Sequence, residues 1–92
     1  MATLTSKINS QSAEFQAKAS AMQTLIEDLQ WQVSKVITGG GEKYQNKHLA
    51  RGKLLPRQRI EHLLDLASPF LELSQLAAHG MYGMHIPSAG II

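Results

Sequence analysis

The sequence predicts a mostly α-helical chain with three helices and short strands. Apolar residues recur at alternating spacings of four and three through residues 15–36, which is the pattern of a helix with one apolar face. Glycine and proline then divide residues 39–56 at points where helices typically end and begin. Short apolar segments at 70–73 and 89–92 have the alternation or the β-branched residues typical of strands.

The first helix is expected from about residue 12 to residue 37. Ser12, or nearby Asn9 or Ser10, can cap its start by accepting a hydrogen bond from a backbone N–H group. The triple glycine at 39–41 is expected to end it, because glycine reaches left-handed dihedral angles without a Cβ clash. Its apolar seam consists of Phe15, Ala19, Met22, Ile26, Leu29, Val33 and Val36, and Leu25 and Ile37 widen it.

This seam spans only about three heptads, so docking on a protein surface is favoured over pairing with a separate partner helix. The residues expected to form the docking face are Phe15, Met22, Ile26, Leu29 and Val33.

Two shorter helices follow. The second is expected from Glu42 to about Arg51, with Gly52 directly after its end. The third is expected to begin near Pro56, because proline at the first helical position wastes no hydrogen bond. Gln58 can reach back to its start. Its expected apolar face is Ile60, Leu63, Leu64 and Ala67, and Ser68-Pro69 is expected to end it.

The remaining residues predict little helix. Phe70–Leu73 reads as a short strand, and a final strand is expected from about Ala89. Residues 74–79 fit either a helix or an extended segment. A chain ending on two isoleucines, without a visible partner strand, is expected to be a fragment of a longer protein.

Composition limits the class of protein. The chain has 92 residues, a formal charge of +2 and no cysteine, so it holds at most one small domain without disulfides or thiolate metal sites. Its apolar runs are far shorter than the roughly 20 residues of a membrane span. No signal core or arginine-rich transit peptide opens the sequence, and a cytoplasmic protein is expected.

Most sequence motifs for catalysis and metal binding are missing. The triple glycine follows a helix and continues as Glu42-Lys43, so it fits neither a Walker loop nor a dinucleotide fingerprint. The four histidines form no HExxH pattern and have no cysteine neighbours, so no metal site is predicted.

The basic segment is the main candidate for function. Six of the nine Lys and Arg residues lie between Lys43 and Arg59. Four of them surround the start of the third helix, where free backbone N–H groups favour anions: Arg51, Lys53, Arg57 and Arg59. They are expected either to contact phosphates or acidic groups of a neighbouring subunit, or to form only a solvated face. A nucleic-acid partner has little support, because aromatic residues do not interleave the cations and the net charge is low.

Residues 39–83, GGGEKYQNKHLARGKLLPRQRIEHLLDLASPFLELSQLAAHGMYG, resemble the start of the carboxyltransferase (beta) subunit of biotin-dependent acyl-CoA carboxylases. The marks are the glycine-rich turn, HxARGKLLxRxRIxxLLD and SPFLELS, which are most like the 3-methylcrotonyl-CoA carboxylase type. The segment INSQSAEFQAKASAM at 8–22 is similar to the leader helix of that type. Two departures are local: Leu55-Pro56 stands where some members have a threonine capping box, and residues 65–68 replace the usual DPGS turn.

The resemblance implies a parent subunit with crotonase-like α/β domains, in which residues 1–41 are a helical extension and residues 42–92 begin the carboxyltransferase N-terminal domain. That subunit would move a carboxyl group from carboxybiotin to 3-methylcrotonyl-CoA in leucine degradation. Biotin would be carried on an alpha subunit or another domain, and further beta subunits would complete a hetero-oligomer. No catalytic residue carries over onto this stretch, so the chain alone is expected to be inactive. The absence of a transit extension implies a bacterial source.

Other functions remain open from the sequence. The acyl-CoA could be geranyl-CoA or propionyl-CoA. The chain could instead be a complete helical interaction module without enzyme activity, or a small nucleic-acid binder that uses residues 43–59. Alone, the chain is expected to be weakly folded or to self-associate, because a domain of this size buries too little surface for independent stability.

Overall fold

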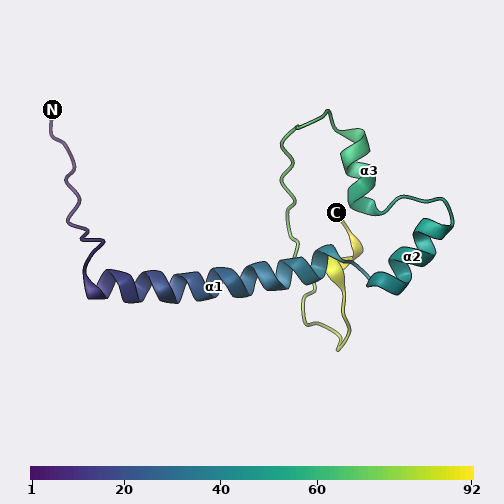
Figure 1. Cartoon of the computed structure of the whole chain (residues 1–92), viewed down its shortest axis with the longest axis horizontal. Coiled ribbons are helices and arrows are strands. Elements are labelled where there is room, and N and C mark those ends of the chain that lie inside the picture. Colours follow the sequence, from purple (N-terminus) through teal and green to yellow (C-terminus); the bar gives the residue numbers. More distant parts are fainter. The chain divides into compact units, whose positions relative to one another are not determined.

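A computed structural model describes all 92 residues. It contains three α-helices, α1 (Ala13–Ile37), α2 (Glu42–Ala50) and α3 (Pro56–Leu63), and a short 3₁₀ turn, η1 (Pro87–Gly90). Irregular segments link α3 to η1 (Figure 1). The chain divides into two units, Met1–Trp31 and Gln32–Ile92, and the helical fold class predicted from the sequence is confirmed.

Helix α1 begins where its capping signals predict. The Ser12 Oγ atom accepts a hydrogen bond of 3.2 Å from the Phe15 backbone N–H group, which satisfies one of the free donors of the first turn. The same hydroxyl donates to the Asn9 carbonyl at 2.8 Å. The choice that the sequence left among Ser12, Asn9 and Ser10 is thereby resolved in favour of Ser12.

The end of α1 also follows the prediction. Gly39 takes a φ of 62°, and its N–H group donates to the Val36 carbonyl at 2.9 Å. A residue with a Cβ atom pays a steric penalty in this left-handed conformation, whereas glycine does not. The chain therefore turns at Gly39, just after α1, and enters α2 three residues later at Glu42.

Helices α2 and α3 are separated by the predicted junction. Arg51 follows the last residue of α2, and Gly52 next to it has a φ of 73°. Pro56 occupies the first position of α3. The Gln58 side chain accepts a hydrogen bond of 2.8 Å from the Leu55 N–H group, so it reaches back to the helix start as expected.

The prediction was wrong about where α3 ends. The helix ends at Leu63, and Leu64 has the extended angles φ −83° and ψ 152°. A turn follows, in which the Ser68 N–H group donates to the Asp65 carbonyl at 3.0 Å and Ala67 takes a φ of 61°. The apolar spacing does not extend the helix, because Leu63 remains 84% exposed and gains no burial there. Ser68 precedes Pro69, and a residue in that position is disfavoured from adopting helical backbone angles.

Both predicted strands are wrong, since the structure contains no strand. Phe70–Leu73 is irregular, and a final strand from Ala89 is replaced by η1 and a short end. A strand needs a neighbour for its backbone hydrogen bonds, and neither segment has one. Residues 74–79, which the sequence left undecided, are neither helix nor strand, and successive turns cover 75–80.

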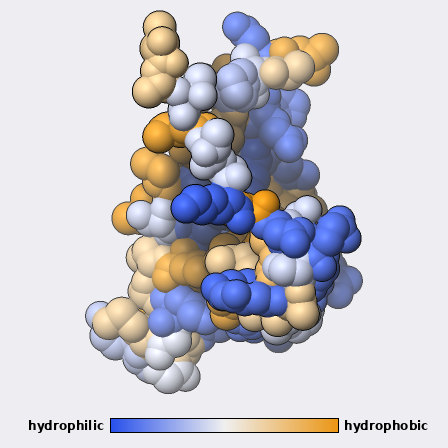
Figure 2. All heavy atoms as spheres, turned by 90° about the vertical axis from the view of Figure 1, so that its left-hand side faces the viewer, coloured by the Kyte–Doolittle hydropathy of each residue, from blue (hydrophilic) through white to orange (hydrophobic).

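Few side chains are buried. Val36 is the one buried apolar residue, at 2% exposure, and Ser88 is the one buried polar residue. On the face drawn in Figure 2, hydrophobic residues lie at the surface beside hydrophilic ones. Both buried residues belong to the unit Gln32–Ile92, so this unit contains the small core.

Candidate functional site around Arg57

Residues 51–60 place their four cations in different environments. Arg51 lies at the C-terminal end of α2, Lys53 in the junction, and Arg57 and Arg59 in the first turn of α3. Arg51, Lys53 and Arg59 are exposed, whereas Arg57 is half-buried. The structure therefore separates Arg57 from the other three cations.

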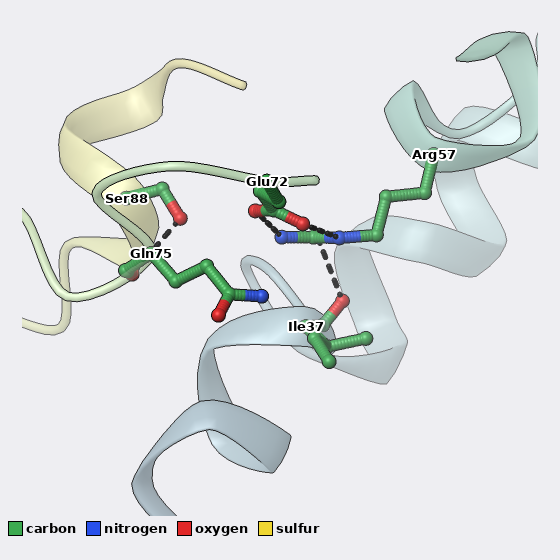
Figure 3. A network of polar contacts seen from close by, with 5 residues as sticks. All are labelled: Ile37, Arg57, Glu72, Gln75 and Ser88. Carbon is green, nitrogen blue, oxygen red and sulfur yellow. Dashed lines mark hydrogen bonds and ion pairs between the residues drawn. The ribbon is translucent and has the colours of Figure 1, made fainter. Parts of the chain in front are cut away.

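The Arg57 guanidinium binds the Glu72 carboxylate in a two-pronged pair (Figure 3). Its Nη2 atom lies 2.5 Å from Glu72 Oε1, and its Nε atom donates to Glu72 Oε2 at 3.1 Å. The third donor, Nη1, bonds the Ile37 carbonyl at the end of α1 at 3.3 Å. One side chain thus joins α3 to α1 and to the segment after α3.

The surroundings of Glu72 favour its charged form. The side chain is only 11% exposed. Hydrogen bonding from Arg57 lowers the pKa of the Glu72 carboxyl. Partial burial opposes this change, and the Arg57 charge and a hydrogen bond with Gln75 lower the pKa further. At neutral pH Glu72 is therefore an anion that neutralises Arg57.

Side chains from three segments bond the backbone carbonyls of residues 37–39, at the end of α1 and directly after it. Besides Arg57 on Ile37, the Gln45 side chain donates to the Thr38 carbonyl, and His85 Nε2 donates to the Gly39 carbonyl at 3.1 Å. A helix end leaves its final carbonyls without intrahelical partners and carries partial negative charge. Through these contacts Gln45, Arg57 and His85 connect their segments to the end of α1.

A second set of bonds fixes η1. The buried Ser88 hydroxyl donates to the Gln75 carbonyl at 3.0 Å (Figure 3), and the Ala89 N–H group donates to the Ala77 carbonyl at 3.0 Å. These bonds hold η1 against the turns that follow Glu72.

Two of the exposed cations share a surface depression. It has a volume of about 450 Å³ and is lined by His48, Lys53, Leu54 and Arg59. His48 Nε2 donates to the Leu54 carbonyl at 2.9 Å, which fixes the wall of the depression. Arg51 does not line it. The sequence placed these cations in one group, but only Lys53 and Arg59 share this site.

A groove of about 440 Å³ lies beside α3 and the segment after it, lined by apolar residues, three acidic ones, Ser68 and Arg57. Ile60, Leu64 and Phe70 contribute apolar walls, and Glu61 and Asp65 stand beside them. Both this groove and the basic depression are open to solvent, so neither encloses an acyl chain or a biotin ring. No group of three or more His, Asp or Glu side chains is arranged to hold a metal ion. None of the helices combines the length and the apolar composition of a membrane span.

Glu72 is the residue that the sequence did not reveal. It appears between Leu71 and Leu73 as the polar member of an alternating segment, which predicts a solvent-facing strand position. Its partner lies 15 residues away, too far for a helical spacing rule to find. Nothing in the sequence marks this acid as the partner, since Glu61 and Asp65 both lie closer to the cations of residues 43–59.

The seam of α1 is exposed in the structure. Phe15 and Ile26 are each 39% exposed, Leu29 is 51% exposed and Met22 is 56% exposed, and Val33 is half-buried. The residues predicted to form a docking face are therefore accessible, and their role in docking stays a prediction.

Most of this sequence is similar to part of several known proteins. No protein-family model matches it. It is 48% identical over 87 residues, 95% of its length, to a probable methylcrotonoyl-CoA carboxylase beta chain, mitochondrial, from Drosophila melanogaster. It is 45% identical over 92% of its length to the methylcrotonoyl-CoA carboxylase beta chain, mitochondrial, of Arabidopsis thaliana. Over 74% of its length it is 52% identical to the biotin-dependent 3-methylcrotonyl-coenzyme A carboxylase beta1 subunit of Mycobacterium tuberculosis.

These matches cover only a small share of each relative. The chain spans 15%, 14% and 13% of the length of the three proteins. The match to the Drosophila protein nevertheless spans 87 of the 92 residues, so it takes in the helix junction and the segment of Glu72. The resemblance found in residues 39–83 is confirmed, and this chain is a relative of the methylcrotonoyl-CoA carboxylase beta chains.

Proposed function

We propose that this chain forms part of the carboxyltransferase (beta) subunit of a biotin-dependent 3-methylcrotonyl-CoA carboxylase. The observation that carries the proposal is the identity of 45–52% to beta chains of that enzyme over 74–95% of this sequence. The parent subunit would transfer a carboxyl group from carboxybiotin to 3-methylcrotonyl-CoA. Within it, residues 1–41 would be a helical extension, and residues 42–92 would begin a crotonase-like domain.

In this proposal the chain supports the enzyme without carrying its chemistry. The groove beside α3 and the basic depression are both open, and no step of the transfer is assigned to their residues. Biotin would be carried by an alpha subunit or another domain, and the acyl-CoA would bind mainly to other parts of the parent. A cytoplasmic, bacterial location stays a prediction, and the mitochondrial location in the relatives' names belongs to those relatives.

The test uses the complete reading frame that contains these residues. The expressed polypeptide, combined with a biotinylated alpha subunit, should carboxylate 3-methylcrotonyl-CoA in a bicarbonate- and ATP-dependent assay. Faster turnover of geranyl-CoA or propionyl-CoA would redirect the substrate assignment to a related carboxylase. A stop codon directly after Ile92, with no carboxylase activity in any combination, would favour a helical interaction module instead.

The basic segment has a more specific role in the proposal. Lys53 and Arg59 line one open depression and are exposed, so they are available to CoA phosphates or to an acidic surface of a neighbouring subunit. Arg51 is also exposed. Arg57 is a weaker candidate for such a contact, because Glu72 already neutralises its guanidinium.

Charge reversal tests this role in the assembled enzyme. Arg59→Glu should raise the apparent KM for acyl-CoA or weaken subunit assembly, and Lys43→Glu, an exposed change on α2, serves as the matched control. Any change that Arg57→Glu causes in KM or assembly should come with a loss of folding stability that Arg59→Glu lacks, because Arg57 bonds Glu72 and the Ile37 carbonyl. Unchanged KM and assembly for Arg59→Glu would show that the arginine belongs to a solvated face.

A further inference from the structure

Residues 79–85 form an exposed loop that is rich in ligands for copper. Its sequence, HGMYGMH, contains two methionines and two histidines. Methionine offers a polarizable thioether sulfur and histidine an imidazole nitrogen, and copper ions bind both. The two methionines, Met81 and Met84, are 50% and 66% exposed, so neither contributes to the small core.

A tight turn brings the two methionines together. The Met84 N–H group donates to the Met81 carbonyl at 3.4 Å, and the two residues between them, Tyr82 and Gly83, have φ values of 60° and 62°. Positive φ at both central residues is typical of a type I′ turn, whose first and last Cα atoms lie within about 7 Å. Methionine side chains are long and flexible, so both sulfur atoms can reach one ion beside the turn.

The hydrogen bond of His85 leaves its other ring nitrogen suited to a metal ion. His85 Nε2 lies 3.1 Å from the Gly39 carbonyl oxygen, and because a carbonyl oxygen only accepts, Nε2 carries a proton. In the neutral ring the lone pair is then on Nδ1. Metal-binding histidines commonly donate their second ring N–H group to a carbonyl in this way, which fixes the tautomer and the orientation of the ring. His85 directly follows Met84, so its Nδ1 atom can add a third donor to the two thioethers.

The composition of this part of the chain narrows the kind of metal. Residues 73–92 contain no Asp, Glu or Cys. Mg²⁺ and Ca²⁺ take oxygen ligands, and zinc sites use thiolate, imidazole or carboxylate ligands. Two thioethers and one imidazole, with no anionic side chain, favour a soft monovalent ion over these divalent ones. Cu(I) is the biological ion of this class, and Ag(I) is its redox-inert analogue.

We propose that the thioether sulfur atoms of Met81 and Met84 and the Nδ1 atom of His85 bind one Cu(I) ion. The proposal goes beyond the proposed carboxylase role and does not depend on it, since it involves neither acyl-CoA nor biotin. The ion is bound and released as Cu(I), without a redox step. Through His85 and its bond to Gly39, the bound ion would join the turn at 81–84 to the segment that follows α1.

Methyl NMR of the 92-residue chain, titrated with silver nitrate in chloride-free buffer, tests the site. The chain has four methionines, and each labelled methyl group gives its own signal. The Met81 and Met84 signals should shift together and stop shifting at one equivalent of Ag(I). Met22 is the matched control, because it is 56% exposed and has no other methionine and no histidine within four residues. Its signal should not move.

Substitutions test each donor. Met81→Leu and Met84→Leu should each raise the dissociation constant for Ag(I) about tenfold or more. Both should leave the helical circular dichroism signal unchanged, because leucine is similar in size and the positions are exposed. Met22→Leu should leave the dissociation constant unchanged. His85→Gln keeps an N–H donor for the Gly39 carbonyl but removes the imidazole lone pair, and should weaken binding by a similar factor.

Four outcomes would overturn the proposal. The first is an equal shift of the Met22 signal and the two loop signals, which would show non-specific binding to thioethers. The second is an unchanged dissociation constant in any of the three loop variants. The third is a shift of the Met81 and Met84 signals by Zn(II) at the same concentration. The fourth is a titration with Cu(I), under anaerobic conditions, that leaves these two signals unmoved.

Discussion

Replacing Arg57 by alanine removes the side chain that joins three segments of the unit Gln32–Ile92. The substitution deletes both bonds to Glu72 and the bond to the Ile37 carbonyl. It also leaves the Glu72 carboxylate, which is 11% exposed, without its charged partner. A poorly solvated anion with fewer hydrogen bonds is costly.

The magnitude follows from the exposure of the pair. Breaking a fully buried ion pair costs about 3–5 kcal/mol, and an exposed pair contributes about 0.2–1 kcal/mol. The side chains of Arg57 and Glu72 are 27% and 11% exposed, and solvent therefore screens part of their attraction. We expect Arg57→Ala to reduce the stability of this unit by about 2 kcal/mol, which corresponds to a roughly 30-fold change in an opening equilibrium.

Amide hydrogen exchange measured by NMR resolves this effect locally. The Leu64 N–H group at the end of α3 and the Ala89 N–H group in η1 both make backbone hydrogen bonds, and they should exchange about 30-fold faster in Arg57→Ala. Arg59→Ala is the matched control, because Arg59 lies in the same turn of α3 and is exposed. Equal exchange in the two variants would refute the assignment of Arg57 as a structural link.

The same pair predicts a dependence on pH. The pKa of Glu72 is lowered in the folded chain, chiefly by its hydrogen bonding with Arg57. A carboxyl whose folded pKa is depressed stabilises the fold above its unfolded pKa, and this contribution is lost as the pH falls through the folded pKa. Protection of the Leu64 amide should therefore decrease below about pH 4. Glu72→Gln should remove this decrease, and an unaltered pH profile in that variant would contradict the reasoning.

Three backbone and capping changes give further expected outcomes. Ser12→Ala should lose the bond to the Phe15 N–H group and reduce the helical circular dichroism signal, at a cost of about 1 kcal/mol; Ser12→Thr should retain most of it. Ala67→Gly should raise the melting temperature by relieving a φ of 61°, a gain of about 1 kcal/mol. Gly39→Ala should lower the melting temperature by a similar amount, because alanine is strained at the Gly39 φ of 62°. No neighbouring atom blocks an added Cβ, so no clash adds to this strain. Equal effects of the last two changes in the same direction would argue against backbone strain as their cause.

Local signals predicted the helices well. The caps at Ser12 and Gln58 each act within three residues of the bonded N–H group, and Gly39 ends α1 through its own backbone angle. Such contacts depend on near neighbours in the sequence, so spacing and residue type are enough to find them. The start of each of the three helices could be predicted for this reason.

The errors have a non-local origin. The segment around Glu72 has strand-like alternation, but a strand also requires a neighbouring strand, and none is present. The predicted continuation of α3 beyond Leu63 had the right apolar spacing but no surface to bury it. In the candidate site, the sequence identified the four cations as one group. It did not identify Glu72, the partner that distinguishes Arg57 from the other three, because Glu72 lies 15 residues from Arg57. Sequence spacing carries no information about such a contact.

The two interpretations of Arg57, a phosphate contact and a structural link, make opposite predictions for a conservative change. Lysine keeps the positive charge but has no planar fork that can bond Glu72 twice and the Ile37 carbonyl as well. If the structural link is the main role, Arg57→Lys in the complete enzyme should accelerate Leu64 amide exchange and leave the KM for acyl-CoA unchanged. A phosphate contact would tolerate lysine in folding but change the KM, because an ammonium binds phosphate as a point charge. The geometry of three donors on three segments leads us to expect the first result, and a raised KM with unchanged exchange would refute it.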